Sequence, residues 1–180
     1  VLYAKLNTDR DRHFSISTTI EERDGQKIVV KNPMTGEAKR HIQRMQKQMQ
    51  DYGSWSPLMG EAGGDGISYP FLEEESLAHQ AQKAVQDHDL EELKRLVGKV
   101  ADICRGGKRD GKGKHIMSQE MSGRERTEFE QVFGTSRMMP GLACISPANI
   151  DLILDNIFEK DGKYYVIDCE WVFDFPVPEK

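Results

Sequence analysis

The chain has 180 residues, of which 37% are hydrophobic and 31% charged, and its formal net charge is -5. That length accommodates one domain with a real core, or two small lobes that share an interface, and it excludes an array of several domains. The mildly acidic balance implies no general attraction to nucleic acid or to an anionic membrane surface.

The cysteines and the apolar runs indicate the redox state of the thiols and the location of the protein in the cell. Cys104, Cys144 and Cys169 lie far apart within apolar runs. Because this spacing fits neither a zinc pattern nor a disulfide framework, we expect reduced, buried thiols. No apolar run approaches the roughly 18 residues of a membrane helix, and no charged and then apolar leader precedes the first strand. We therefore expect no membrane span and a cytoplasmic location.

The first part of the chain has the pattern of consecutive β-strands. Residues 1–8 and 14–22 alternate between apolar and polar side chains, and Asp24-Gly25 precedes the apolar run at 27–31. Asp-Gly between two such runs is a strong hairpin signal. The pattern predicts three consecutive antiparallel strands, the third of which ends at Asn32-Pro33 because proline lacks a backbone donor.

A helix and a glycine-rich stretch follow these strands. Thr35 can cap a helix whose apolar stripe we interpret as core packing. Residues 53–66 are rich in glycine but lack the Gly-Lys-Ser/Thr ending of a phosphate-binding loop, so we expect an ordinary loop there. Residues 67–72 have the pattern of a strand that leads into three glutamates. The stripe consists of Ala38, Ile42, Met45, Met49 and Tyr52.

The middle of the chain is predicted to be helical. Residues 76–86 form a polar helix, and Asp89, with Glu92 three residues later, marks the start of a second helix with a broad apolar face that extends to Cys104. Residues 105–114 are basic and glycine-rich. They are either a solvated insert or a loop that attracts a phosphorylated or polyanionic substrate. We expect a further helix at 117–133 and irregular structure at 136–146.

The stretch from residue 149 to 171 contains the most distinctive polar pattern. It predicts a strand at 154–158, a tight Asp-Gly turn at 160–163 and a second strand at 164–167. Antiparallel pairing would bring Asn156 and Asp168 together, and Asp151 could face the same space from the preceding loop. Hard cations such as magnesium take oxygen ligands and keep substrate phosphates in their shell. The alternative is that these residues only cap and turn the backbone.

Asp151, Asn156 and Asp168 resemble the D-x-x-x-x-N catalytic loop and the following metal-binding Asp of the protein-kinase-like phosphotransferases. The nearest likeness is to the aminoglycoside and choline kinases, because Asp168 stands in an Ile-Asp-x-Glu context. The chain departs from the family pattern in three respects. Asn149 replaces the family's histidine, Cys169-Glu170 follows Asp168 where Phe-Gly is usual, and a glycine-rich phosphate loop is missing near the start.

The resemblance implies a role for each of these residues. Asp151 would orient or deprotonate the acceptor hydroxyl, and Asn156 and Asp168 would hold Mg²⁺. The segment that ends in Lys31 resembles the Val-Ala-Ile-Lys strand, so Lys31 would contact the phosphates of ATP and pair with a helix carboxylate, for which Glu37 is the candidate. Residues 67–75 resemble the strand and acidic linker that join the two lobes. For Lys31 the alternative is a solvated residue at a sheet edge.

We therefore predict an α+β fold with a kinase-like arrangement of two lobes. Residues 1–75 would form an antiparallel sheet with one helix, and residues 76–180 a helical lobe with the β-hairpin site, as a partial lobe of a longer protein. Trp55 and Trp171 are expected to pack in the interior.

The function predicted from the resemblance is transfer of phosphate from Mg-ATP to a sugar or glycan hydroxyl. The wider stretch up to residue 176 is similar to modules of bacterial surface-polysaccharide proteins with glycosyltransferase or methyltransferase domains. We expect those neighbouring transferase domains as partners, with their active sites outside these 180 residues. The alternative is a non-catalytic kinase-like scaffold or sugar-binding module of such a protein.

Overall fold

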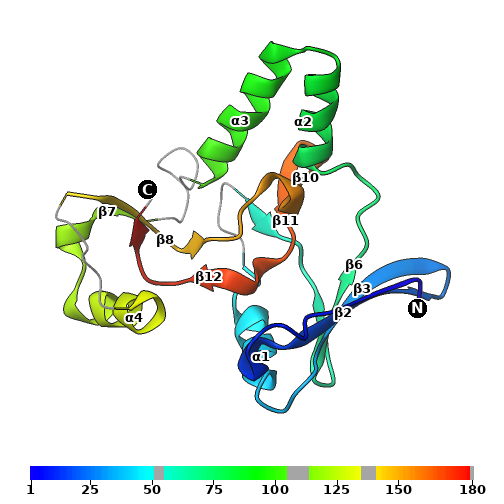
Figure 1. The fold of residues 1–180 in the computed structure, drawn as a ribbon, viewed down its shortest axis with the longest axis horizontal. Helices are drawn as coiled ribbons and strands as arrows, with labels where there is room; N and C mark the ends of the chain where they lie inside the picture. The colour runs from blue at the N-terminus through cyan, green and yellow to red at the C-terminus, as the bar shows by residue number, and fades with distance from the viewer. Residues whose placement is uncertain (51–54, 105–113, 135–140, 179–180) are drawn as a thin grey trace. The chain divides into compact units, whose positions relative to one another are not determined.

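The computed structural model of the chain describes residues 1–50, 55–104, 114–134 and 141–178. They form α-helices and antiparallel sheets, which confirms the predicted α+β class (Figure 1). The chain divides into two compact units, residues 1–50 with 57–74 and residues 51–56 with 75–180. The second unit thus resumes at Glu75, one residue before the division predicted from the sequence.

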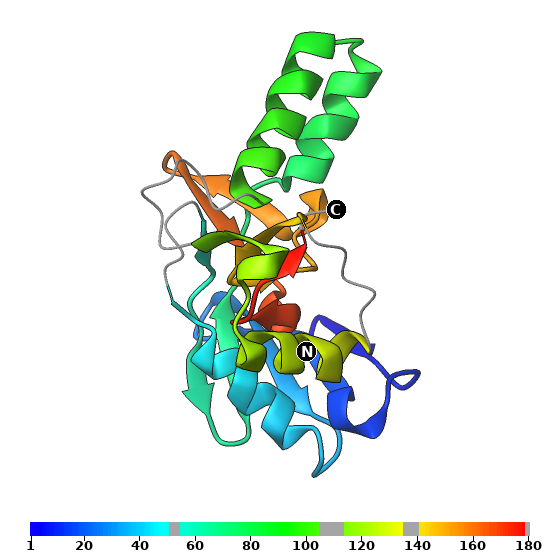
Figure 2. The same ribbon diagram turned by 90° about the vertical axis from the view of Figure 1, so that its left-hand side faces the viewer.

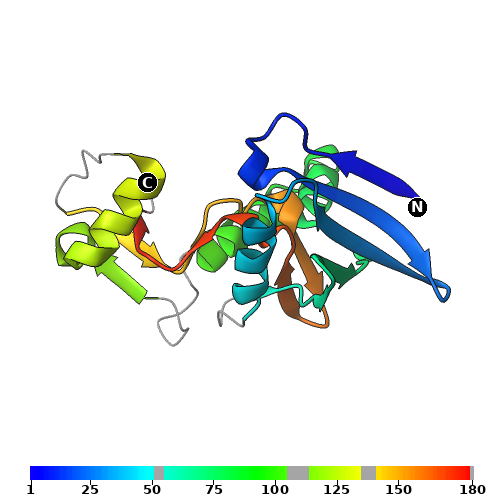
Figure 3. The ribbon, with the colours of Figure 1, turned by 90° about the horizontal axis from the view of Figure 1, so that it is seen from below.

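The first unit is built on a five-stranded antiparallel sheet with the strand order β1-β2-β3-β6-β5. The three consecutive strands predicted at the start of the chain are all present (Figures 1 and 3). Asp24 and Gly25 form the two-residue turn between the second and third, and both have positive φ angles, 52° and 76°. Asp-Gly favours this turn because it tolerates the left-handed conformation. The strands are β1 (Tyr3–Leu6), β2 (Ile16–Arg23), β3 (Gln26–Pro33), β5 (Glu61–Gly63) and β6 (Gly66–Pro70).

One helix, α1 (Lys39–Lys47), packs on one face of this sheet. Its buried residues Ile42 and Met45 contact Ile16 and Ile67 of the sheet, so the predicted apolar stripe is core packing. Thr35 Oγ1 accepts the predicted capping bond from the Ala38 backbone N–H at 3.2 Å, but residues 36–38 form a turn and the helix itself begins at Lys39. Tyr52, the last residue of the predicted stripe, lies outside the described residues.

The prediction of a plain loop at 53–66 is wrong for residues 56–57, which form strand β4, for residues 61–63, which form β5, and for Gly66, which begins β6; residues 53 and 54 lie outside the described residues. Strand β5 pairs with β6 in the register Gly63↔Gly66, and Gly64 makes the turn with φ 57°. Strand β5 could not be predicted because the small side chains at 62 and 63 give no alternation of apolar and polar residues. Backbone hydrogen bonds to the neighbouring strand still stabilise it. Pairing with β5 also places β6 inside the sheet, between β3 and β5.

The second unit begins with a helical hairpin, α2 (Leu77–Gln86) and α3 (Leu90–Cys104), whose helices lie side by side (Figures 1 and 2). Both predicted starts are confirmed. Ser76 Oγ accepts a hydrogen bond from the His79 backbone at 3.3 Å, and Asp89 Oδ1 accepts one from the Glu92 backbone at 2.9 Å. The side chains thereby satisfy amides of the first turn that have no partner within the helix. The sequence also places the end of the second helix at Gly106-Gly107, and these two residues lie outside the described residues.

The largest core of the second unit joins the helical hairpin to the β-hairpin that carries the predicted site. Leu77 and Leu96 come from the helices and Ile157 and Val166 from the β-hairpin, and all four are fully buried. Trp55 packs in the same core with 6% of its surface exposed, as expected. Burial of a leucine or isoleucine of this kind contributes roughly 1.5–3 kcal/mol. The packing of one face of the β-hairpin against the two helices therefore holds the hairpin in place.

A second, aromatic core lies around helix α4 (Gly123–Phe133). Phe129 contacts Phe175, and Phe133 contacts both Phe173 and Phe175, at ring-centroid separations of 5.3 to 6.3 Å. Trp171 packs against this cluster, as expected from the sequence. The helix begins at residue 123, later than the predicted 117, because Ser122 and Glu125 form a reciprocal capping box.

Two short sheets surround this aromatic core. The prediction of irregular structure at 136–146 is wrong for residues 143–146, which form a strand between two partners that are distant in the chain. Residues 105–113, in the predicted basic loop, lie outside the described residues. The sheets have the orders β13-β8-β7 and β12-β9, with β7 (Lys114–Met117), β8 (Ala143–Ser146), β9 (Ala148–Asn149), β12 (Val172–Phe173) and β13 (Val177–Pro178).

The structure also bears on the expected burial of the three thiols and on the expected absence of a membrane span. Cys104, Cys144 and Cys169 are free thiols, but burial is complete only for Cys144, and the other two are half-buried. The expectation of buried thiols is therefore correct in full for one of the three. Within the described ranges, none of the helices combines the length and the apolar character that a bilayer crossing requires.

Candidate functional site

The predicted site lies on the β-hairpin of strands β10 (Ile157–Lys160) and β11 (Lys163–Val166), in a sheet of order β10-β11-β4, where β4 is Ser56–Pro57. Asp161 and Gly162 form its two-residue turn, with φ angles of 51° and 72°. The predicted turn and second strand are confirmed. The first strand begins at 157 rather than 154, because residues 154–156 form a turn of 3₁₀-helix.

The loop before the hairpin is closed by two asparagine side chains. Asn156 Nδ2 donates a hydrogen bond to the Asp151 carbonyl at 3.0 Å, and Asn149 Oδ1 accepts one from the Asp151 backbone N–H at 3.0 Å. The backbone of Asp151 is therefore held on both sides. Since Nδ2 of Asn156 is directed at the loop, its Oδ1 is the amide atom suited to a cation on the other side.

Asp168 is joined to this loop through the backbone. The Asn156 carbonyl accepts a hydrogen bond from the Ile167 N–H at 2.9 Å, so Asn156 lies opposite the residue that precedes Asp168. Asp168 itself has left-handed backbone angles, φ 59° and ψ 43°. A non-glycine residue in that conformation costs on the order of 1 kcal/mol, and such residues cluster at functional sites.

The structure thus places Asp151, Asn156 and Asp168 in one unit and connects their segments by hydrogen bonds. Among the described residues there is no group of three or more His, Cys, Asp or Glu side chains suited to a metal ion. The predicted site would need none, because magnesium bound to phosphates takes one or two carboxylates and fills its shell with phosphate and water oxygens. Metal binding by Asn156 and Asp168 stays a prediction.

Two residues near the site are absent from the set predicted from the sequence. Glu170 is buried, with 3% of its surface exposed, two residues after Asp168. Asn149 bonds to the Asp151 backbone through Oδ1 and lies 4.0 Å from Cys169 Sγ through Nδ2. The burial of Glu170 has a sequence signal, because the residues after it are the apolar run Trp-Val-Phe. The bridging role of Asn149 has none.

Lys31 lies in the first unit and is buried, with 7% of its surface exposed. It stands on β3 between Thr18 of β2 and Ile67 of β6. Residues directly opposite one another in a sheet point to the same side. Because Ile67 packs against α1, Lys31 points to the α1 face. The alternative of a solvated residue at a sheet edge is therefore wrong, and burial of an ammonium group is costly without compensating interactions.

Glu37 lies in the turn before α1, where its carboxylate forms an ion pair with Arg12 at 3.2 Å. A hydrogen bond from its own backbone N–H, followed by the charge of Arg12, lowers the pKa of this carboxyl below its ordinary value. Helix α1 itself contains no aspartate or glutamate. The pairing of Glu37 with Lys31 stays a prediction, and the ion pair that the structure describes is with Arg12.

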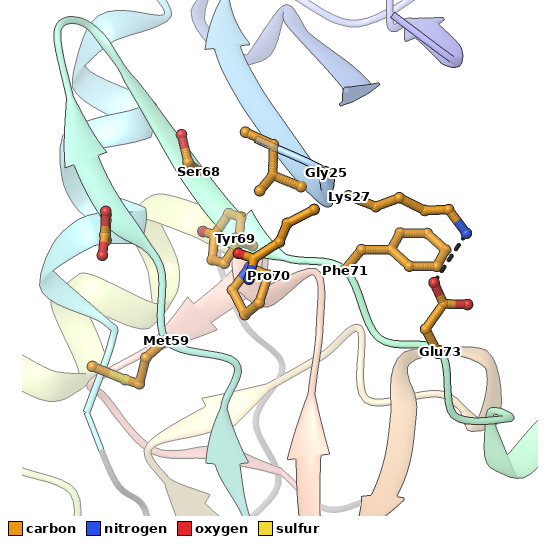
Figure 4. Close-up of a pocket in the computed structure, with 11 residues that line it drawn as sticks. Gly25, Lys27, Met59, Ser68, Tyr69, Pro70, Phe71 and Glu73 are labelled. Atoms are coloured by element: carbon orange, nitrogen blue, oxygen red, sulfur yellow. Dashed lines mark hydrogen bonds and ion pairs between the residues drawn. The ribbon is translucent and has the colours of Figure 1, made fainter. Parts of the chain in front are cut away.

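The first unit also contains a pocket of about 750 Å³ beside the ends of β3 and β6 (Figure 4). Lys27 lies at its margin, 2.9 Å from the Glu73 carboxylate and 5.1 Å from the centre of the Phe71 ring. Ile28 and Ser68 line it, and both alternate with residues of the α1 face. Tyr69, which packs against the cluster on the α1 face, also lines the pocket, so its lining comes from both faces at the end of the sheet. Lys31 is not among the residues that line it.

No protein-family model matches the chain, and no curated protein matches it. The kinase likeness of residues 149–171 stays a prediction based on the residues themselves.

Proposed function

We propose that the chain is a kinase-like phosphotransferase module with two lobes, which transfers phosphate from Mg-ATP to a sugar or glycan hydroxyl. The observation that supports the proposal is a pair of hydrogen bonds at Asn156, whose side chain donates to the Asp151 carbonyl at 3.0 Å and whose carbonyl accepts from the N–H of Ile167, next to Asp168, at 2.9 Å. Asp168 adopts left-handed backbone angles two residues after strand β11, and non-glycine residues in that conformation cluster at functional sites.

Phosphoryl transfer needs positioning and neutralisation of charge more than covalent chemistry by the protein. Asn156 and Asp168 would hold magnesium, which when bound shields the phosphate oxygens. Asp151 would orient the acceptor hydroxyl and accept its proton, and its backbone is already fixed for this purpose. Lys31 would neutralise nucleotide phosphates from the first unit, where its burial strengthens every interaction of its charge.

The order of elements also favours this proposal. A five-stranded antiparallel sheet includes one helix between its third and fourth strands along the chain and ends in an acidic segment at residues 73–75. A helical hairpin and then the β-hairpin with the polar loop follow. This is the order of strands, helix, linker and helical lobe that the resemblance implies. We further propose that the module acts in bacterial envelope-polysaccharide synthesis, beside glycosyltransferase or methyltransferase domains.

A second function, that of a non-catalytic scaffold of such a protein, is favoured by one observation. The carboxylate expected to pair with Lys31 is engaged by Arg12, and α1 offers no other. A scaffold does not need the pair of lysine and helix carboxylate that phosphoryl transfer by a kinase requires. In that case residues 149–171 would serve only to shape the surface of the module.

Thermal melting with and without Mg-ATP tests the proposal. A ligand that binds only the folded chain stabilises it by about 2.7 kcal/mol at one hundred times its Kd, so the melting temperature of the parent should rise. The Asp168→Ala variant should lose this rise. Asp155→Ala is the matched control, because Asp155 is an exposed carboxylate one residue before Asn156.

The two functions give different results in this experiment. A rise that occurs in the parent and in Asp155→Ala but not in Asp168→Ala supports the phosphotransferase. If millimolar Mg-ATP leaves the melting temperature of the parent unchanged, the scaffold function is the better account. A rise that survives in Asp168→Ala would show that the nucleotide binds without the proposed metal ligand.

A further inference from the structure

Asn149 lies on strand β9, just before the loop of Asp151, and this strand runs beside β12, which follows Asp168 in the chain. Its strand β9 pairs with β12 in the register Asn149↔Val172, and the Ile150 N–H donates to the Trp171 carbonyl at 3.2 Å. The backbone of Asn149 is therefore held opposite Val172, the residue that follows the turn containing Asp168 and Cys169. From this position its side chain can reach both segments.

The side chain of Asn149 contacts both segments with opposite ends of its amide. Oδ1 accepts a hydrogen bond from the Asp151 N–H at 3.0 Å, and Nδ2 lies 4.0 Å from Cys169 Sγ. The thiol of Cys169 in turn donates to the Val166 carbonyl at 3.6 Å. Donors and acceptors alternate consistently along this series, which extends from strand β11 to the loop of Asp151.

We propose that Asn149 is a positioning residue that sets the separation between Asp151 and Asp168. This inference rests on the proposed function. One side chain is tied to the residue proposed as the base and to the residue after the proposed metal ligand, so its loss would let the two segments move independently. Groups that orient a ligand residue typically affect metal affinity or activity by about 10- to 100-fold.

The proposal also accounts for the replacement of the family's histidine at this position. A neutral imidazole presents one acceptor and one donor nitrogen, as an amide side chain does through its oxygen and nitrogen. Histidine could therefore take over both contacts of Asn149. Alanine can form neither, and it leaves the pairing of β9 with β12 intact because that pairing uses the backbone alone.

The test compares Asn149→Ala, Asn149→His and the control Ile150→Ala, whose side chain is exposed on the neighbouring residue. The readouts are Mg²⁺ affinity by titration in the presence of ATP, and kcat and KM for release of inorganic phosphate from Mg-ATP. We expect Asn149→Ala to bind Mg²⁺ about 10- to 100-fold more weakly in the presence of ATP, and to lose kcat at saturating Mg²⁺ and ATP by a similar factor. Asn149→His should recover most of both losses.

The outcomes separate this inference from the proposed function. If the parent and Ile150→Ala bind Mg-ATP and Asn149→Ala does so with unchanged Mg²⁺ affinity and kcat, the positioning role is refuted while the proposed function stands. An equal loss in Asn149→Ala and Asn149→His, each with its melting temperature lowered, would mark Asn149 as a structural residue only. A parent that binds no Mg-ATP would refute both proposals.

Discussion

Replacement of Asp151 by asparagine is expected to slow phosphoryl transfer by about 10²- to 10⁴-fold while Mg-ATP still binds. The two hydrogen bonds that fix this residue use its backbone N–H and carbonyl, so the substitution preserves the shape of the loop. It removes only the proton acceptor and the negative charge. Nucleotide and metal are assigned to other residues, and their affinity should change little.

The rates measured are those of transfer of labelled phosphate from ATP to each of a panel of sugars and of hydrolysis of ATP by water. The thermal shift with Mg-ATP is measured alongside. Asp155→Asn is the matched control, because it changes an exposed carboxylate in the same loop. A rate loss in Asp151→Asn without loss of the thermal shift supports a base that acts after binding. Equal rates in both variants would show that Asp151 has no part in the transfer.

Replacement of Leu96 by alanine is expected to destabilise the second unit by about 2–5 kcal/mol. Leu96 on α3 is fully buried, and the core around it includes Ile157 and Val166 of the β-hairpin. The loss combines the transfer free energy of the removed atoms with the cost of the cavity they leave. Because this core supports the hairpin, the same variant should also weaken binding of Mg-ATP.

Urea unfolding followed by fluorescence measures this loss as a change in midpoint. Val97→Ala is the matched control, since Val97 is adjacent on the same helix and 55% exposed. A surface substitution of this kind should alter stability by less than about 0.5 kcal/mol. Similar midpoints for Leu96→Ala and Val97→Ala would contradict the description of a single core beneath the hairpin.

Elements whose signals are local in the chain could be predicted from the sequence. Asp24-Gly25 and Asp161-Gly162 both form two-residue turns with positive φ angles, because Asp-Gly favours that conformation regardless of the surroundings. Asp89 caps α3 through a bond to a backbone N–H three residues away. In each case the interacting groups are neighbours in the sequence, so a short window contains all the necessary information.

Elements that depend on distant partners could not be predicted in this way. Strands β5 and β8 are short, and they exist because β6 and the pair β7 and β13 supply their hydrogen bonds. The same reason applies to the site. The burial of Lys31 follows from its position on a central strand beneath α1, and the ion pair of Glu37 with Arg12 joins residues 25 apart.

Paramagnetic broadening of backbone amide signals by Mn²⁺ in the presence of ATP tests the central claim most directly, and a chain of 20.5 kDa is suitable for such spectra. The claim is that Asn156 and Asp168 hold a divalent cation beside Asp151. We predict that broadening at low Mn²⁺ is strongest at residues 151, 156 and 168, is reversed by excess Mg²⁺ and is lost in Asp168→Ala. Broadening that is uniform, or strongest at exposed carboxylates elsewhere such as Glu61 and Glu73, would contradict the claim.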